Sequence, residues 1–402
     1  MKKKILILNA PCNGFGDLIF AAKLSKYLQK KYKAKVRIAT TLHEGLKNIG
    51  FPKSEIVELK AKKIKQCRRF SGLKMEKIPK QDLIFVAPLQ ADFSADFRDV
   101  KKIIPYSNRE NTFFFSEYND SLNKGLDFNT GIGSKRDGIL ITDVSKRMPN
   151  VKRGKRGKGF KGRGALKNPF ALIYVASTLP RLQHCIVSFV EMVAKKYHKI
   201  YKNFDIVVPP WFIKEDFDKM IIKKVSKYYD KILIKGRDET INISDGSRVL
   251  TFRADVLPVP NDVMLALMRG SVEDILLTGD QSISDCLSCC PEKNIFYQIA
   301  PWKKNFADNL AKYMPNASLK KKSTSCGSIK AISYKKHSYK KFVKDWDFRK
   351  RTAKKLDSII KNDKIRKICN VAKIQKGKIC NPATGRWVKK DGKIGKKINA
   401  KK

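Results

Sequence analysis

The sequence has no apolar run of 18 or more residues, which excludes an ordinary hydrophobic transmembrane helix. Acidic residues are scarce: 37 Asp and Glu stand against 87 Lys and Arg, and the formal net charge is +50. A charge of this size favours attraction to polyanions such as nucleic acid, an anionic membrane or nucleotide phosphates. Lysine is spread over every segment, however, and this distribution is equally typical of a compositional bias unrelated to any ligand.

The chain also lacks the histidine and cysteine patterns of most metal sites. Its four histidines form no constellation with Ser or Cys, although His43 follows a predicted strand whose end could line a cleft. No second cysteine pair or histidine follows Cys286, Cys289 and Cys290 at ligand spacing, so we expect these thiols in the core and no metal. Nine cysteines fit no complete disulfide framework and indicate a reducing compartment.

A secretory signal is not expected either. Lysines 2–4 are followed by an apolar stretch, 5–8, as at the opening of a signal peptide, but that stretch is too short for one. We therefore expect a protein without a signal peptide or a membrane-spanning segment.

What the chain does contain is an alternation of short apolar runs and helical stripes. Its length of 402 residues, 42% of them hydrophobic, suffices for two or three domains. Short apolar runs bounded by turn residues predict strands buried in parallel sheets. The aromatic run 113–115 is assigned to buried core. Predicted strands are 5–8, 35–40, 55–59, 82–87, 138–143, 170–176, 205–209, 231–234, 249–252, 274–277 and 294–299, and the later predicted helices are 183–195, 262–269, 282–289 and 305–313.

Two successive βαβα series predict the fold class. We expect an α/β protein with two Rossmann-like, doubly wound parallel-sheet halves and a basic C-terminal extension. In such sheets the ligand lies outside the carboxyl ends of the strands.

Changes of composition predict the division into domains. Residues 152–159 contain no acidic and no apolar residue, which is typical either of a solvated interdomain loop or of an RG-type polyanion contact. Residues 319–402 hold 29 Lys and Arg against five Asp and Glu, and 337–362 fits a basic amphipathic helix. We expect an N-terminal Rossmann-like domain over 1–150, a basic linker over 151–167, a second Rossmann-like domain over 168–318, a basic helical segment over 319–366 and a terminal module over 367–402.

The first candidate site is a glycine loop between the strand 5–8 and a helical stripe. A strand, a tight glycine loop and a helix bring backbone N–H groups and a helix N-terminus to a ligand. Asp17 stands at the start of this helix, where it suits both a catalytic base and an ordinary N-cap. The loop residues are Asn13, Gly14 and Gly16.

The second candidate site follows the predicted strand 274–277. Again a buried strand leads through a glycine-containing turn to a helix N-terminus, whose N–H groups suit a pyrophosphate. Ser282 can cap this helix or donate to a phosphate oxygen. The candidate binding residues are Gly279, Asp280, Gln281 and Ser282.

Over about residues 1–315 these two loops resemble the GT-B class of glycosyltransferases, above all the lipopolysaccharide heptosyltransferases and the protein-arginine rhamnosyltransferases. The resemblance implies that Asp17 is the base acting on the acceptor bound by 1–150. It also implies that 168–318 holds a nucleotide-sugar, with Gly279–Ser282 near its diphosphate. Neither a metal nor a cofactor is implied, in keeping with the lack of an Asp-x-Asp motif at a strand end.

One feature departs from the heptosyltransferase pattern. Those enzymes carry Asp-x-Gly followed by histidine, whereas this chain has Gly279-Asp280 with no histidine nearby. The nucleotide of the donor therefore stays open among UDP, ADP, GDP and dTDP.

The last residues resemble a second family. The stretch 378–397 is similar to the 2-cysteine adaptor motif of large DNA virus proteins, which implies a viral origin and a targeting role, in the host cytoplasm or the virion. The second cysteine of that motif is replaced by Trp387, and Cys369 is the candidate substitute. The matched residues are Cys380, Asn381, Pro382, Gly385, Arg386 and Trp387.

Two alternatives to the enzyme remain open. The chain could be a non-catalytic basic virion or nucleic-acid-binding protein on the same scaffold, with the basic tail binding nucleic acid without sequence preference. In the other alternative, the Rossmann halves are a scaffold and the terminal module docks a host or viral protein.

Overall fold

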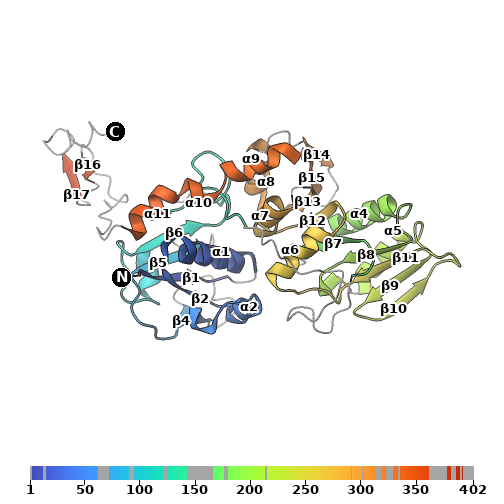
Figure 1. Cartoon of the computed structure of the whole chain (residues 1–402), viewed down its shortest axis with the longest axis horizontal. Coiled ribbons are helices and arrows are strands. Elements are labelled where there is room, and N and C mark those ends of the chain that lie inside the picture. The colour runs from blue at the N-terminus through green and yellow to red at the C-terminus, as the bar shows by residue number, and fades with distance from the viewer. Residues whose placement is uncertain are drawn as a thin grey trace. The chain divides into compact units, whose positions relative to one another are not determined.

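The computed structural model divides the chain into two compact units (Figure 1). Unit 1 comprises Met1–Leu140 and Asp347–Lys402, and unit 2 comprises Ile141–Trp346. The structure describes residues 2–11, 15–61, 72–89, 95–120, 125–142, 166–175, 180–212, 215–290, 292–300, 303–313, 318–322, 329–333, 336–361, 378–381, 386–389 and 392.

Unit 1 is built on a six-stranded sheet of order β4-β3-β2-β1-β5-β6. All neighbouring pairs are parallel except β3 and β4. The chain adds β2 and β3 on one side of β1 and then β5 and β6 on the other, which is the doubly wound arrangement. The strands are β1 (Lys4–Asn9), β2 (Lys35–Thr40), β3 (Ile56–Ala61), β4 (Leu73–Met75), β5 (Leu83–Leu89) and β6 (Thr112–Ser116).

The helices of unit 1 follow from its apolar stripes. In the first helix, Leu18, Leu24 and Leu28 recur at helical spacing and are completely buried. The short third helix begins at an aspartate cap, because the Asp96 side chain accepts a hydrogen bond from the Arg98 N–H. The elements are α1 (Phe15–Tyr32), α2 (His43–Asn48), η1 (Lys53–Glu55) and α3 (Phe97–Lys101).

Unit 2 is built on a nine-stranded sheet of order β10-β9-β11-β8-β7-β12-β13-β15-β14. The six strands from β9 to β13 in this order are parallel, and β10, β14 and β15 pair antiparallel. The strands are β7 (Phe170–Tyr174), β8 (Asn203–Val207), β9 (Lys231–Lys235), β10 (Glu239–Asn242), β11 (Val249–Arg253), β12 (Asp274–Leu277), β13 (Asn294–Gln298), β14 (Ser318–Lys322) and β15 (Ile329–Ser333).

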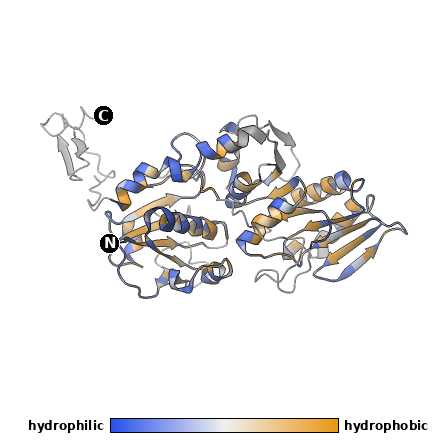
Figure 2. Ribbon diagram, in the orientation of Figure 1, coloured by the Kyte–Doolittle hydropathy of each residue, from blue (hydrophilic) through white to orange (hydrophobic). Residues whose placement is uncertain are grey.

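Helices cover the sheet of unit 2. Apolar residues of α4 and α5 pack with the strands in one buried cluster, and Figure 2 shows hydrophobic strands beneath helices that carry polar residues. Cys286 and Cys289 on α7 and Cys290 at its C-cap are buried thiols. The helices are α4 (Pro180–Tyr197), η4 (Pro210–Phe212), α5 (Glu215–Val225), α6 (Asn261–Gly270), α7 (Asp280–Cys289), α8 (Lys304–Tyr313) and α9 (Lys336–Asp345).

The two doubly wound sheets confirm the predicted fold class. One predicted strand is wrong, because residues 138–142 make only isolated bridges, Gly131 with Gly138 and Ile139 with Asp347. Gly138 has a φ of +91°, a left-handed conformation that a regular strand does not contain.

The C-terminal segment differs most from the expected division. Instead of one helix over 337–362, α9 belongs to unit 2, whereas α10 (Phe348–Arg351) and α11 (Ala353–Ile360) belong to unit 1 (Figure 1). The helix is interrupted because the Asp347 side chain accepts a hydrogen bond from the Arg349 N–H and so caps a new helix. Residues 318–322 and 329–333 are strands of unit 2.

The docking of α10 and α11 on unit 1 is apolar at its centre. The Phe348 ring is completely buried between Phe115 of β6 and Phe128, with ring centroids 6.1 and 5.9 Å away. Its backbone N–H donates to the Ile139 carbonyl at 2.9 Å. Tyr32 at the end of α1 donates a 2.7 Å hydrogen bond to the Asp357 carboxylate on α11. These residues therefore complete the core of unit 1.

Of the predicted linker, residues 151–165 lie outside the described part of the chain. The terminal module contains one antiparallel hairpin, β16 (Lys378–Asn381) with β17 (Arg386–Lys389).

Candidate functional site

The carboxyl end of β1 is the switch point of the unit 1 sheet, because β2 and β3 lie on one side of β1 and β5 and β6 lie on the other. The helix α1 begins just beyond this end, and Asp17 lies half-buried in its first turn. A carboxylate there is stabilised by the partial positive charge of the helix N-terminus. Gly16 is exposed in the same turn, whereas Asn13 and Gly14 lie outside the described residues.

Asn9, the last residue of β1, fixes this turn. It is completely buried, and its Nδ2 donates to the Ala87 carbonyl of β5 at 3.0 Å and to the Asp17 carbonyl at 3.1 Å. Its Oδ1 accepts a 3.1 Å hydrogen bond from the Thr40 hydroxyl at the end of β2. One amide thus joins three strand ends to the first turn of α1. Sequence reasoning missed it, although a polar residue closing an apolar run beside a glycine loop was a usable signal.

The end of β2 adds polar groups at the same edge. The Thr41 hydroxyl donates to the Pro11 carbonyl at 2.8 Å, which ties this strand end to the loop after β1. His43 follows, with Nε2 3.3 Å from a Glu44 carboxylate oxygen and Nδ1 buried without a hydrogen-bond partner among the described residues. His43 thus lies just beyond the end of β2, and its expected place in a cleft stays a prediction.

The carboxyl end of β7 is the switch point of the unit 2 sheet, since β8 and β12 flank it. The helix α7 follows β12 there, with Gly279 as its N-cap residue and no side-chain cap. The first intrahelical bond runs from Ile283 to the Gly279 carbonyl, so the N–H groups of 280–282 have no acceptor within the helix. A Cβ on Gly279 would lie 3.1 Å from the Ser282 hydroxyl, so glycine keeps that side of the turn open.

The Asp280 carboxylate is turned inward. Its Oδ2 lies 2.7 Å from the Lys303 ammonium, and its Oδ1 accepts a 3.1 Å hydrogen bond from the Tyr297 hydroxyl. Burial, followed by the charge of Asp280, raises the pKa of Tyr297, which holds the phenol neutral as a donor. Lys303 was missed by sequence reasoning. It adds a cation next to the N-terminus of α7, which is already suited to anions.

Gln281 and Ser282 are buried with Asp280 in the first turn of α7. The Gln281 amide donates to Asp285 at 3.3 Å, and the Thr142 hydroxyl donates to the same carboxylate. Burial, and then the nearby Asp285 charge, raises the pKa of Tyr174 at the end of β7. A helix start lined by hydroxyl, amide and ammonium groups can bind an oxyanion and hydrogen-bond a polar ligand.

The candidate residues therefore lie in separate units, with Asp17 in unit 1 and Gly279–Ser282 in unit 2. In the terminal hairpin, Cys380 pairs directly with Trp387, and Asn381 pairs with Arg386. Pro382 and Gly385 lie outside the described residues.

Among the described residues, no helix is long and apolar enough to cross a membrane. Nor do those residues include a group of three or more His, Cys, Asp and Glu suited to a metal ion.

Comparison with solved structures finds similar chains at low sequence identity. A putative UDP-N-acetylglucosamine 2-epimerase from Listeria monocytogenes is 10% identical, with a TM-score of 0.43 over 89% of this chain and 96% of that one. A glycosyl transferase family 9 protein from Veillonella parvula is 10% identical, with a TM-score of 0.37 over 75% and 83%. The E. coli heptosyltransferase WaaC with ADP is 7% identical, with a TM-score of 0.33 over 68% and 81%. No protein-family model and no curated protein matches the chain.

Proposed function

We propose that this chain is a glycosyltransferase that transfers a sugar from a nucleotide-sugar, with the acceptor bound by unit 1 and the donor by unit 2. One observation carries the proposal. Each doubly wound sheet presents a helix N-terminus at its switch point, one with a carboxylate and the other with N–H groups and an ammonium. Glycosyl transfer without a metal requires a general base for the acceptor and groups that stabilise the negative charge of the leaving diphosphate.

In unit 1, Asp17 acts as general base. Its carboxylate takes the proton of an acceptor hydroxyl while that oxygen forms a bond to the anomeric carbon of the donor. The hydrogen bond from Asn9 to the Asp17 carbonyl supports this role, because it fixes the backbone from which the carboxylate projects.

In unit 2, the first turn of α7 holds the diphosphate. As the bond between the anomeric carbon and the diphosphate oxygen breaks, negative charge develops on that oxygen. The N–H groups of Gln281 and Ser282, the partial charge of the helix and the Lys303 ammonium stabilise it. The pair with Asp280 supports this role by holding the Lys303 side chain beside the turn.

The terminal hairpin serves as an adaptor module that directs the enzyme to a host or viral protein, in the host cytoplasm or the virion of a large DNA virus. The likeness of residues 378–397 to the viral 2-cysteine motif supports this part of the proposal. Four motif residues lie within the hairpin strands: Cys380, Asn381, Arg386 and Trp387.

A second candidate function is non-catalytic binding of nucleic acid, and the formal net charge of +50 favours it. The two candidates differ in selectivity, because diffuse charge attracts every polyanion whereas a donor site selects one nucleotide.

The test is thermal unfolding of the full chain with UDP-, GDP-, ADP- and dTDP-sugars at about 0.15 M salt. We expect one nucleotide to raise Tm selectively, and Asp17→Asn to keep that rise while stopping release of the nucleoside diphosphate. If every polyanion, including a nucleic acid, raised Tm equally, the proposal of a glycosyltransferase would fall and non-catalytic nucleic-acid binding would be the better proposal.

A further inference from the structure

The segment after β6 carries an arginine to the ligand-binding edge of unit 1. The ring of Tyr118 packs edge-on against Phe20 of α1, with centroids 5.6 Å apart, one helical turn after Asp17. The Tyr118 hydroxyl accepts a 2.7 Å hydrogen bond from the Leu140 N–H. The segment that contains Arg136 is thus held at both ends beside the first turns of α1.

The guanidinium of Arg136 is only partly satisfied. Its Nη2 donates to the Asp120 carbonyl, whereas Nη1 is out of water and has no hydrogen-bond partner in the part of the chain that the structure describes. Burial lowers the pKa of Arg136 even though Asp120 and Asp137 act in the opposite direction. A charged donor withdrawn from water without an acceptor is unfavourable, and a bound anion would supply the missing acceptor.

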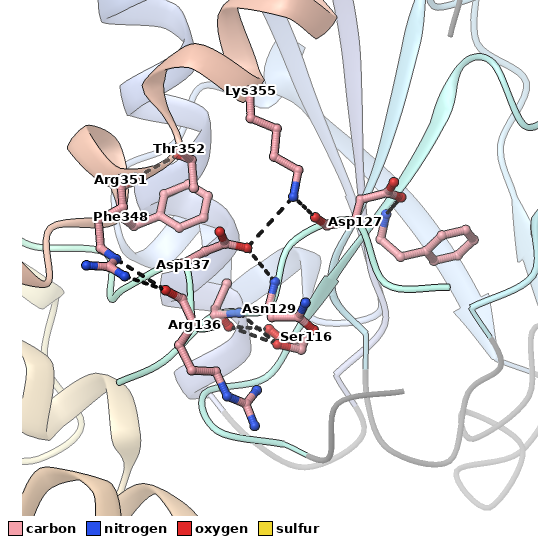
Figure 3. A network of polar contacts seen from close by, with 11 residues as sticks. Ser116, Asp127, Asn129, Arg136, Asp137, Phe348, Arg351, Thr352 and Lys355 are labelled. Carbon is pink, nitrogen blue, oxygen red and sulfur yellow. Dashed lines mark hydrogen bonds and ion pairs between the residues drawn. The ribbon is translucent and has the colours of Figure 1, made fainter. Parts of the chain in front are cut away.

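Neighbouring residues hold the backbone of Arg136 rigidly (Figure 3). Its N–H donates to the Gly133 carbonyl at 3.1 Å, and its own carbonyl accepts from Nε and Nη2 of Arg351 at 3.2 and 3.0 Å. The next residue, Asp137, exchanges hydrogen bonds of 2.7 and 2.6 Å with the backbone of Asn129. In Figure 3 the Arg136 side chain points away from this network, so these contacts do not involve its guanidinium.

The turn preceding Arg136 is fixed by a second set of contacts. The Asn119 side chain donates to the Ile132 carbonyl at 2.6 Å and accepts from the Ile132 N–H at 2.8 Å. Its backbone N–H donates to the Thr130 carbonyl at 3.1 Å. An arginine on so constrained a loop is pre-organised, and binding an anion there costs little conformational entropy.

We propose that Arg136 binds an anionic group of the ligand of unit 1, a carboxylate or a phosphate, and that Arg351 is its positioning residue. A guanidinium matches the paired oxygens of either group. The assignment of that ligand as the sugar acceptor rests on the proposed function, but anion binding itself does not. Arg351 acts through the Arg136 carbonyl, so the docking of α10 prepares the anion site.

The experiment is calorimetric titration of the full chain with inorganic phosphate and, separately, with acetate, at about 0.15 M NaCl. We expect one saturable site, whose Kd rises about tenfold or more in Arg136→Gln. Arg136→Lys keeps the positive charge but not the planar set of N–H donors of the guanidinium, and it is expected to retain only part of the affinity. Arg351→Gln is expected to weaken binding by a smaller factor. Arg98→Gln, which removes an exposed arginine of the same unit, is the matched control.

The two anions separate a phosphate-bearing from a carboxylate-bearing ligand. Anion binding that is equal in wild type, Arg136→Gln and Arg98→Gln would overturn the proposal in favour of diffuse charge, and so would the absence of saturable binding. Because no nucleotide-sugar is present, this result is independent of the donor test. Thermal unfolding of each variant separates a lost contact from a lost fold, and Arg136→Lys supplies a second measurement if Arg136→Gln does not fold.

Discussion

Lys303 Nζ lies 2.7 Å from Asp280 Oδ2, and this pair joins the residues after β13 to the first turn of α7. The carboxylate is buried, and the lysine side chain is 18% exposed. The charge of Asp280 is therefore balanced inside unit 2.

We predict that Lys303→Met destabilises the protein by about 3 kcal/mol, because it leaves a buried carboxylate without its cation. The double variant Lys303→Met with Asp280→Asn removes that charge and is expected to recover most of the loss, while donor binding stays weak in both. Urea unfolding with and without the selected nucleotide measures the two effects. If the single and double variants were equally destabilised, the loss would not come from the unpaired charge of Asp280.

Gly131 and Gly50 provide a matched comparison of backbone strain. Gly131 has a φ of +116°, and a Cβ there would lie 2.2 Å from Asn119 Oδ1, whereas Gly50, with a φ of +83°, has nothing within 4 Å. We expect Gly50→Ala to cost about 1 kcal/mol, from conformation alone. Gly131→Ala adds the clash and is expected to cost about 3 kcal/mol or more. Equal losses in urea unfolding would show that the Asn119 contact yields easily.

The stability of unit 1 is expected to depend on acid pH through α11. The hydrogen bond from Tyr32 and then the ion pair with Lys361 lower the pKa of Asp357 from 3.8 to about 2. Since the folded-state pKa is the lower one, the stabilisation is present above pH 3.8 and is lost as pH falls toward 2.

Asp357→Asn should therefore flatten the fall in Tm between about pH 4 and 2. Asp238→Asn, at an exposed turn of unit 2, is the control and should leave the slope unchanged. The same slope in wild type and Asp357→Asn would locate the acid sensitivity elsewhere.

Truncation tests whether α10 and α11 belong to the core of unit 1. A chain ending at residue 361 should unfold within a few degrees of the full chain, because the core side chain Phe348 is retained. A chain ending at 346 loses that ring from between Phe115 and Phe128, and we expect a loss of about 3 kcal/mol or more. Similar Tm values for both would show that the segment only lies on the surface.

Much of the fold was predictable because it depends on local pattern. The apolar runs of β1 and β12 are strands buried on both faces, so composition alone marks them. The strand β6 was recognised only as aromatic core, although Ser and Asn residues flank it on both sides. The break between α9 and α10 was missed although Asp347 is a local N-cap residue, since its backbone bridge to Ile139 joins segments far apart in the sequence.

The residues of the candidate sites also divide into those marked by local pattern and those brought together only by the fold. A helix start after a buried strand is a local feature, and it located both Asp17 and the first turn of α7. The partners of these residues are not local. Lys303 lies 23 residues from Asp280, and Arg351 lies 215 residues from Arg136. Such pairs exist only in the folded chain, so spacing could not reveal them.

The return of residues 347–361 to unit 1 sets an order for folding during synthesis. Every strand of the unit 1 sheet is made before residue 117, but the ring of Phe348 follows after more than two hundred further residues. Until then Phe115 and Phe128 lack the Phe348 ring that packs against both, and we expect a ribosome-bound N-terminal half to leave part of these rings uncovered. Unit 2 can close its parallel sheet in the interval, and the half that is synthesised first is therefore the half that matures last.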